Sequence, residues 1–397
     1  MRVRSFVALA AIAAIAACTD GPVEPTQIKA VDARTSHALG SAPYTLGPTR
    51  LFLPIEVDAT GAPVRKAGGQ GAAAITAATQ PDILYWGGNV INQQKFAAIY
   101  YSEEGRIYED GPRLGSIGAG KDDRSLVGYF LNNLGGSSYW NINSTYYDQR
   151  GGSRDFVRNT MDYDSFWAPK FNPQGSSKLV SIDDMVNLIE AGLANGALKY
   201  DPNTLYMIFT GPGVNLGGGF SKQILNYCAF HTGYWYTDGS RLVQFAAMPY
   251  DADFNPDHPY RYRGADGKKH SAVCTFLTKG PNGDLGADAT VSGMAHEIEE
   301  NATDPVTLYR VPVTPDNPYG IQGFFAGWYD VLGEENGDKC AYTYGYEPNA
   351  PPKNRLDYWN LRIGHKQFLV QQNWSNVAPQ RCLTGLGRDT GGGSDDR

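Results

Sequence analysis

The sequence predicts an α+β fold in which one mixed β-sheet is combined with a zincin-like helix. The first observation is the order of the local patterns. A helix pattern that begins after Ser181 is followed by several apolar strand patterns and then by a second helix pattern around His296, an order typical of α+β domains. The second is composition, because 47 glycines and 25 tyrosines in 397 residues favour turns and strands over long helices. Residues 81–386 show no internal repeat and no composition break, so we expect a single body.

The first 80 residues are expected to export and tether this body. Two arginines precede an apolar run that ends at residue 17 and is too short to span a bilayer. The run closes with Ile-Ala-Ala before Cys18 and resembles a bacterial lipobox, in which the cysteine is lipidated and becomes the mature N-terminus. We expect a lipoprotein signal peptide at residues 1–17 and a flexible tether at residues 18–80, which are rich in Ala, Gly, Pro and Thr. An ordinary secretory signal is the alternative.

Lipidation of Cys18 makes the membrane the first expected partner, because an anchor of two or three acyl chains holds a protein stably at a bilayer. The expected location is the bacterial cell envelope, outside the cytoplasm, and the outer membrane where the cell has one. The net charge of −7 argues against a general affinity for nucleic acid.

Four cysteines remain after Cys18, and export places them in an oxidising compartment. They predict two disulfides, with all three pairings open because the spacing does not choose among them. A zinc site made of all four is the weaker alternative, since the sequence has no C-x-x-C pair. The four are Cys228, Cys274, Cys340 and Cys382.

Local signals place the regular elements in order. Residues 124–134 carry apolar side chains at helical spacing. Ser181 can cap a second helix, with Asp184 in the reciprocal position of a capping box. Gly364 marks the turn of a closing hairpin at residues 359–374, and the tail at residues 387–397 is expected to be disordered. Strands are predicted at residues 51–57, 83–91, 95–101, 203–210, 227–235 and 242–250, with the second and third forming a hairpin and the last two forming a pair.

The segment with the clearest chemistry is an H-E-x-x-E motif formed by His296, Glu297 and Glu300. In a helix, residues four apart share one face, so His296 and Glu300 can bind one zinc ion through a nitrogen and an oxygen. Glu297 would then act as the general base, as in H-E-x-x-H metalloproteases. Here a carboxylate replaces the second histidine. The alternative is an exposed acidic helical turn.

The surroundings of the motif favour a metal site. Asp288 or Ser292 can cap the start of the helix, and Pro305 ends it. Small and apolar residues precede the motif, which suits a buried segment, and buried ionisable groups need a partner such as a cation. The turn-rich stretch at residues 327–340 supplies four acids, Asp330, Glu334, Glu335 and Asp338. The expected third ligand is Glu335 or Asp304, with Glu335 favoured because it lies on a later segment that can fold back.

Two further candidates have weaker support. His231 beside a predicted strand is a possible additional ligand, although a lone histidine there is more often a hydrogen-bonded core residue. Asp251, Asp253 and Asp257 lie close together in a loop and could bind calcium, but they lack EF-hand spacing and are more simply explained as solvated acids.

Eight short segments resemble the EXORDIUM / phosphate-induced protein 1 family and its microbial relatives, over residues 81–384. The segments are YWGG at 85–88, YMIFTGPG at 206–213, YCAFH at 227–231, AMPY at 247–250, the H-E-x-x-E stretch with TDP at 295–305, GWYD at 327–330, ENGDKC at 335–340 and QNWS at 372–375. The resemblance implies an extracellular setting more firmly than an activity, because plant members are wall-associated growth proteins and the H-E-x-x-E stretch occurs in plant and microbial members alike. Trp86 stands where many relatives have a histidine, so that position is given no role.

Two functions are compatible with these patterns. The first is a lipid-anchored zinc hydrolase, most simply a peptidase, with Glu297 as general base. The second is a non-catalytic surface module that binds glycan or cell wall, in which the metal only holds the fold. A carboxylate ligand lowers the positive charge at the metal and weakens its Lewis acidity, which keeps the second function open.

Overall fold

The computed structural model describes most of the predicted body and short parts of the segment before it. The described residues are 44–45, 52–59, 64, 81–103, 105–173, 179–214, 216, 227–235, 241–264, 266–306, 308–310, 321–323, 327–345 and 359–387. The predicted signal peptide with Cys18 lies outside them, as does the predicted tail after its first residue.

A seven-stranded mixed sheet forms the centre of the molecule, which confirms the α+β prediction. Its four inner strands are parallel to one another, and the strands at both margins run antiparallel to their neighbours. The order is β1 (Tyr44–Thr45), β10 (Phe230–Trp235), β11 (Leu242–Met248), β9 (Thr204–Thr210), β4 (Gln94–Tyr101), β8 (Met161–Trp167) and β5 (Ile117–Ala119). Every residue of β9 is buried, as expected for a parallel strand covered on both faces.

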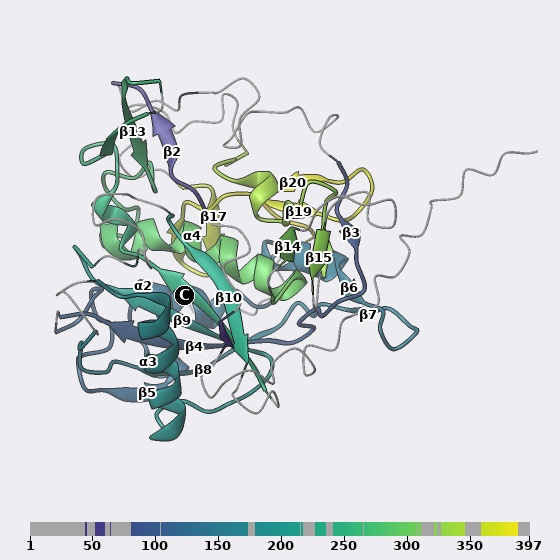
Figure 1. Ribbon diagram of the computed structural model, residues 1–397, viewed down its shortest axis with the longest axis horizontal. Coiled ribbons are helices and arrows are strands. Elements are labelled where there is room, and N and C mark those ends of the chain that lie inside the picture. Colours follow the sequence, from purple (N-terminus) through teal and green to yellow (C-terminus); the bar gives the residue numbers. More distant parts are fainter. Residues whose placement is uncertain are drawn as a thin grey trace, which may run out of the picture.

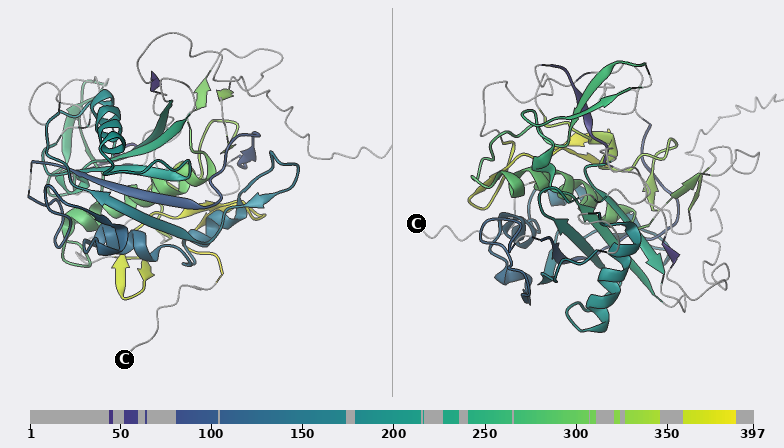
Figure 2. Two further views of the ribbon diagram at one scale, coloured as in Figure 1. Left: turned by 90° about the horizontal axis from the view of Figure 1, so that it is seen from below. Right: turned by 60° about the vertical axis from the view of Figure 1, so that its left-hand side comes forward.

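Helices cover both faces of this sheet (Figures 1 and 2). The helix α3 (Ile182–Ala194) lies on one face, while α2 (Leu126–Asn133) and α4 (Leu285–Thr303) lie on the other. Successive side chains of a strand point to opposite faces. Accordingly, Ile99 of β4 belongs to the core under α3, and its neighbour Tyr100 belongs to the core under α2 and α4.

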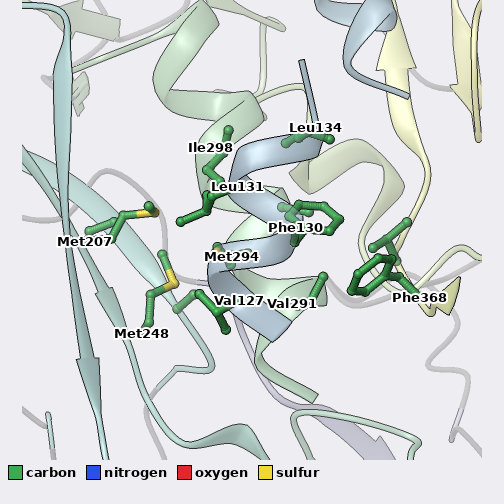
Figure 3. Close-up of a cluster of buried hydrophobic side chains, with 14 of the residues drawn as sticks. Val127, Phe130, Leu131, Leu134, Met207, Met248, Val291, Met294, Ile298 and Phe368 are labelled. Atoms are coloured by element: carbon green, nitrogen blue, oxygen red, sulfur yellow. The ribbon is translucent and has the colours of Figure 1, made fainter. Parts of the chain in front are cut away.

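The core between α2, α4 and the sheet is apolar and closely packed (Figure 3). From α2, Phe130 and Leu131 point toward α4, which contributes Met294 and Ile298. This face of α4 holds the helix in place, so its other residues can carry polar side chains.

Several local predictions are confirmed. Ser181 and Asp184 form the expected capping box at the start of α3, because each side chain bonds the other residue's backbone N–H. The strands β10 and β11 pair antiparallel as predicted. The closing hairpin consists of β17 (Leu361–Ile363) and β18 (Lys366–Phe368), with Gly364 at a φ of 56° in its turn.

The predicted hairpin at residues 83–101 is wrong. Of its first arm only β3 (Leu84–Tyr85) is a strand, and β3 pairs with β16 (Trp328–Tyr329). The second arm is β4, which pairs with β8 and β9 and lies at the centre of the sheet. The apolar pattern of both segments is satisfied by partners that are distant in sequence, which a local pattern cannot identify.

Smaller sheets and 3-10 helices complete the body. Two pieces of the segment expected to be a tether join it: β1 pairs with β10, and β2 forms an edge strand, as predicted for residues 51–57. The remaining elements are β2 (Ile55–Val57) with β12 (Tyr260–Arg263) and β13 (Lys269–Val273), β6 (Tyr147–Asp148) with β7 (Asp155–Phe156), β14 (Leu308–Arg310) with β15 (Ile321–Gly323), β19 (Asn373–Ser375) with β20 (Arg381–Leu383), and the 3-10 helices η1 (Gly120–Asp122), η2 (Trp140–Thr145), η3 (Asp251–Asp253) and η4 (Asp338–Cys340).

The cysteines form two disulfides, as predicted, and the structure selects the pairing. Cys228 bonds Cys274, and Cys340 bonds Cys382. The first joins the segment before β10 to the end of β13, and the second joins η4 to β20.

The start of α4 differs from the prediction. Asp284 is the N-terminal cap and accepts a hydrogen bond from the backbone N–H of Ala287 at 3.1 Å, so neither Asp288 nor Ser292 caps the helix. Asp288 instead lies in the first turn and accepts two hydrogen bonds from Asn282, at 2.7 and 3.0 Å. The helix therefore begins one turn earlier than expected.

Asp288 predicts a pH dependence of stability. Burial raises its pKa from 3.8 to about 6, although the bonds from Asn282 oppose the shift. A carboxyl group with a raised pKa in the folded state favours folding when protonated, so its contribution is full below about pH 4 and is lost as the pH rises through 6, by about 2–3 kcal/mol. Between pH 4 and pH 7, urea denaturation should show the natural protein losing about 2–3 kcal/mol more than Asp288→Asn, because the other buried acids are common to both proteins. Parallel pH profiles for the two proteins would contradict it.

Candidate metal centre

Seven ionisable side chains converge where β10, α4 and the loop after β16 meet. Six are at most 1% exposed, and the seventh, Asp338, has a side chain that is 13% exposed. The residues are His231 from β10, His296, Glu297 and Glu300 from α4, Asp304 at the C-terminal cap of α4, and Glu335 and Asp338 from the loop. Residues far apart in the sequence thus meet at one buried place. Six of them are site candidates predicted from the sequence, and Asp338 was noted there as one of the acids of the loop.

The motif residues lie on the polar side of α4. The Nε2 of His296 lies 3.0 Å from Glu300 Oε1 and 4.0 Å from Glu297 Oε1. Glu297 is fully buried, and its Oε1 accepts no hydrogen bond from the described residues. The expected proximity of His296 and Glu300 on one face is therefore present.

His231 approaches the same carboxylates from β10. Its Nδ1 lies 3.0 Å from Glu297 Oε2 and 3.6 Å from Glu300 Oε2, and its Nε2 lies 2.9 Å from the backbone oxygen of Asp304. A carbonyl oxygen can only accept, so Nε2 carries a hydrogen and donates it. Nδ1 is then the nitrogen that faces the two carboxylate oxygens, and a backbone bond at the other nitrogen is a common way to orient a metal-binding histidine.

Without a metal, a proton can occupy the position between His231 and the acids. Burial alone would lower the pKa of His231, but Glu335, Glu297 and Glu300 together outweigh burial and raise it to about 10. His231 therefore acts as a cation in the metal-free protein. A metal ion at Nδ1 would displace that proton.

His296 has a different hydrogen-bond pattern. The Nε2 of Gln371 lies 2.9 Å from the Gly337 carbonyl oxygen, which requires a donor and so fixes the side-chain amide orientation. The same Nε2 lies 2.8 Å from His296 Nδ1 and donates its second hydrogen there. His296 therefore carries its own hydrogen on Nε2, which lies 3.0 Å from Glu300 Oε1, an oxygen that accepts the backbone N–H of Asp338 at 2.9 Å. This pattern favours His231 as the nitrogen ligand and makes His296 a residue that orients Glu300.

A rigid loop presents Glu335 and Asp338. Asp330 closes a turn by accepting the backbone N–H groups of Leu332 and Glu334, each at 2.8 Å, and forms a buried ion pair with Lys339 at 2.9 Å. The disulfide of Cys340 secures the end of the loop. Sequence inspection had marked this loop only as a source of acids.

Gly337 of this loop lies directly against the motif. A Cβ atom there would lie 2.8 Å from Glu300 Oε1 and 2.9 Å from His296 Nδ1. Only a residue without a side chain lets the loop approach α4 this closely.

Several buried carboxylate oxygens in the cluster accept no hydrogen bond from the described residues. They are Glu297 Oε1, Asp304 Oδ2 and both oxygens of Glu335. Burial raises the pKa of Glu300 and of Asp304 well above the usual range, and the neighbouring Glu335 adds to both shifts. Buried acids without donors are costly, and a cation would relieve that cost.

Within this cluster, three sets of potential ligand atoms lie within 4.8 Å of one another. Each set combines one histidine nitrogen with two carboxylate oxygens, a donor mixture that suits zinc. The sets are His231–Glu297–Glu300, His231–Asp304–Glu335 and His296–Glu300–Asp338. Asp304 and Glu335 thus lie beside His231, and Asp338 Oδ1 lies 3.9 Å from His296 Nε2.

Phe52, from the expected tether, covers one side of the site. Its ring centroid lies 4.5 Å from that of His296 and 4.8 Å from that of Tyr342, and the residue is 1% exposed. Its backbone N–H donates to Ala229 at 3.0 Å, which ties it to the segment before β10. Sequence inspection gave no signal for this contact.

The three loop acids considered for calcium differ in burial and hydrogen bonding. Asp251 is 1% exposed, and one of its oxygens lies 3.2 Å from the position of a Cβ at Gly293 in α4. Asp253 accepts the backbone N–H of Gly213 at 2.6 Å, whereas Asp257 is exposed. Burial raises the pKa of Asp251 well above its usual range, so this residue is not a solvated acid.

A hollow of about 440 Å³ lies elsewhere on the described surface, lined by residues 106–110. None of these residues belongs to the cluster. Tyr108 connects the hollow to α4 through a hydrogen bond of 3.2 Å to Thr290, upstream of the motif.

Two curated proteins of Arabidopsis thaliana are similar to this chain. Protein EXORDIUM-like 3 is 22% identical over 284 residues, which cover 65% of this chain and 74% of that protein. Protein EXORDIUM-like 5 is 22% identical over 282 residues, which cover 64% of this chain and 67% of that protein. No protein-family model and no solved structure matches the chain. The similarity supports a distant relationship to EXORDIUM-like proteins, whose names state no reaction.

Proposed function

We propose that this protein is a lipid-anchored, extracytoplasmic, zinc-dependent hydrolase. The observation that supports it is the buried convergence of His231 Nδ1 with oxygens of Glu297 and Glu300, beside carboxylate oxygens that lack donors. Buried charges in proteins are paired or bind metal ions, and this donor set fits zinc.

In this proposal each side chain has a distinct task. His231 and the carboxylates of Glu297 and Glu300 would hold the metal, with His296 lying 3.0 Å from the Oε1 of Glu300 and helping to position it. Zinc bound there supplies Lewis acidity and makes water a better nucleophile near neutral pH. Glu297 Oε1, which has no competing donor, accepts the proton from the attacking water and passes it to the leaving group. A peptide bond is the first substrate class, by analogy with zincin helices.

The cellular setting is part of the proposal. Lipidation at Cys18 would tether the body to the membrane of the cell envelope, and the two disulfides suit an oxidising compartment. Within the described parts of the chain, no helix has the length and apolar character needed to cross a membrane.

A second candidate function is a non-catalytic surface module that binds glycan or cell wall and has a structural metal. Burial is the observation that favours it, because His231, Glu297 and Glu300 are at most 1% exposed and the hollow at residues 106–110 lies away from them. A structural site is closed, whereas a catalytic one keeps a position open for water or substrate.

Glu297→Gln separates the two functions. An amide keeps an oxygen but cannot accept a proton, so we expect hydrolysis to fall by about 10²–10⁴-fold at zinc concentrations that saturate both proteins. The assay uses the full chain with quenched peptide libraries and with cell-wall glycans, and zinc content is measured in parallel.

Glu299→Gln is the matched control. Burial raises the pKa of Glu299 well above its usual range, so the residue is a neutral acid that glutamine resembles in shape, and this variant should keep full activity. An active Glu297→Gln would exclude the general-base role. A natural protein that binds zinc but cleaves nothing would support the second function.

A further inference from the structure

We infer that the cluster binds a second divalent cation, at an oxygen-only site formed by Asp304 and Glu335 on the far side of the His231 ring. The inference rests on the proposed function in one respect, which is that His231 Nδ1 faces the zinc. It adds a separate metal site with different ligand chemistry.

The geometry of this second site is set by three groups. Glu335 is fully buried, and neither of its carboxylate oxygens receives a hydrogen bond from the described residues. Asp304 Oδ2 is also without a donor, whereas its Oδ1 accepts the backbone N–H of Gly327 at 3.3 Å. Ligand atoms of Asp304, Glu335 and His231 lie within 4.8 Å of one another. Three oxygens without a donor among the other described residues thus face one small buried region, where the Asp304 and Glu335 carboxyl groups hydrogen-bond each other through a proton that a metal ion would displace.

His231 separates this region from the zinc site. Its Nε2 donates a hydrogen to the Asp304 carbonyl oxygen at 2.9 Å and lies 3.9 Å from Glu335 Oε1. A nitrogen that carries a hydrogen cannot bind a metal, so the second site has only oxygen ligands. Oxygen ligands select hard cations such as Ca²⁺, Mg²⁺ and Mn²⁺ over zinc.

Charge balance also calls for a second ion. Glu297, Glu300, Asp304 and Glu335 are four buried carboxylates, and no lysine or arginine of the described residues forms an ion pair with them. Lys339 of the same loop forms its ion pair with Asp330, at 2.9 Å. With all four acids ionised, one divalent ion leaves two negative charges in a buried region, which either protons or a second divalent ion must neutralise; two divalent ions balance all four when the histidines are neutral.

The test uses Mn²⁺ as a hard, paramagnetic probe. The full chain is stripped with a chelator, reloaded with one equivalent of zinc and titrated with Mn²⁺, and bound Mn²⁺ is counted by electron paramagnetic resonance. We expect about one Mn²⁺ per zinc-loaded chain. In Glu335→Gln the affinity for Mn²⁺ should fall by at least about 10-fold while zinc content is unchanged, and the control Glu299→Gln should keep both ions.

Two results would overturn the inference: a zinc-loaded chain that binds no Mn²⁺, or a Glu335→Gln variant that loses zinc and keeps Mn²⁺. If Glu335→Gln does not fold, anomalous diffraction from the natural chain at the zinc and manganese edges decides, since two separate peaks are expected and a single peak contradicts the second site. Binding of both ions without hydrolysis would refute only the proposed function. Bound zinc without Mn²⁺ would refute only the second site.

Discussion

We expect His231→Gln to abolish stable zinc binding, with a loss of affinity greater than the roughly 10–100-fold that removal of an orienting partner costs. The reason is the hydrogen bond from Nε2 to the Asp304 carbonyl, which leaves Nδ1 toward Glu297 and Glu300. Glutamine offers no nitrogen lone pair at that position. Competition with a fluorescent zinc chelator measures the affinity of the folded variant.

His296→Gln is the matched comparison for this prediction. His296 lies 3.0 Å from Glu300 Oε1 and accepts a hydrogen bond from Gln371, so its loss should loosen Glu300 and weaken zinc binding by roughly 10–100-fold without abolishing it. The reverse order, with His296→Gln losing zinc and His231→Gln keeping it, would show that the metal lies on the Asp338 side of the cluster. It would also support His296 and Glu300 as the zinc ligands, as expected from the H-E-x-x-E motif.

The second large effect concerns stability. The double substitution Cys340→Ser and Cys382→Ser removes a disulfide between residues that are 42 positions apart. We expect the free energy of unfolding to fall by about 4 kcal/mol, because the unfolded chain is then less constrained. The same disulfide ends the loop whose Asp338 N–H bonds Glu300 Oε1, so zinc affinity should fall as well. Urea denaturation of oxidised natural protein and variant measures the first effect.

The other disulfide provides the control. Cys228 and Cys274 are separated by 46 residues, so their removal should cost a similar free energy. A loss below about 1 kcal/mol for either pair would contradict the chain-entropy argument. Equal zinc affinities in the natural protein and in the Cys340–Cys382 variant would show that the loop does not need this bond to present its acids.

Local signals predicted those parts of the fold that depend on neighbouring residues. The capping box of Ser181 and Asp184, the buried strand β9 and the turn at Gly364 each follow from the conformational preferences of a few adjacent residues. The pairing of strands that are distant in sequence could not be predicted from such local signals. Both arms of the expected hairpin at residues 83–101 found distant partners instead.

The same division applies to the candidate site. The proximity of His296 and Glu300 follows from helical periodicity, and the acidic loop was visible as a run of polar turn residues. The distinction between the two histidines was not visible, because it depends on Gln371 and on a backbone carbonyl, each brought in by tertiary folding. The contact of Phe52 with His296 could not be predicted for the same reason.

Zinc content is the most direct measure of the central idea that the buried acids and His231 are held together by a metal ion. The full chain is isolated from the cell envelope without chelators, and its metals are quantified by inductively coupled plasma mass spectrometry. We predict about one zinc per chain, released only slowly by a chelator because the site is buried. A folded, disulfide-bonded chain that contains no zinc and takes up none at micromolar concentration would contradict the account.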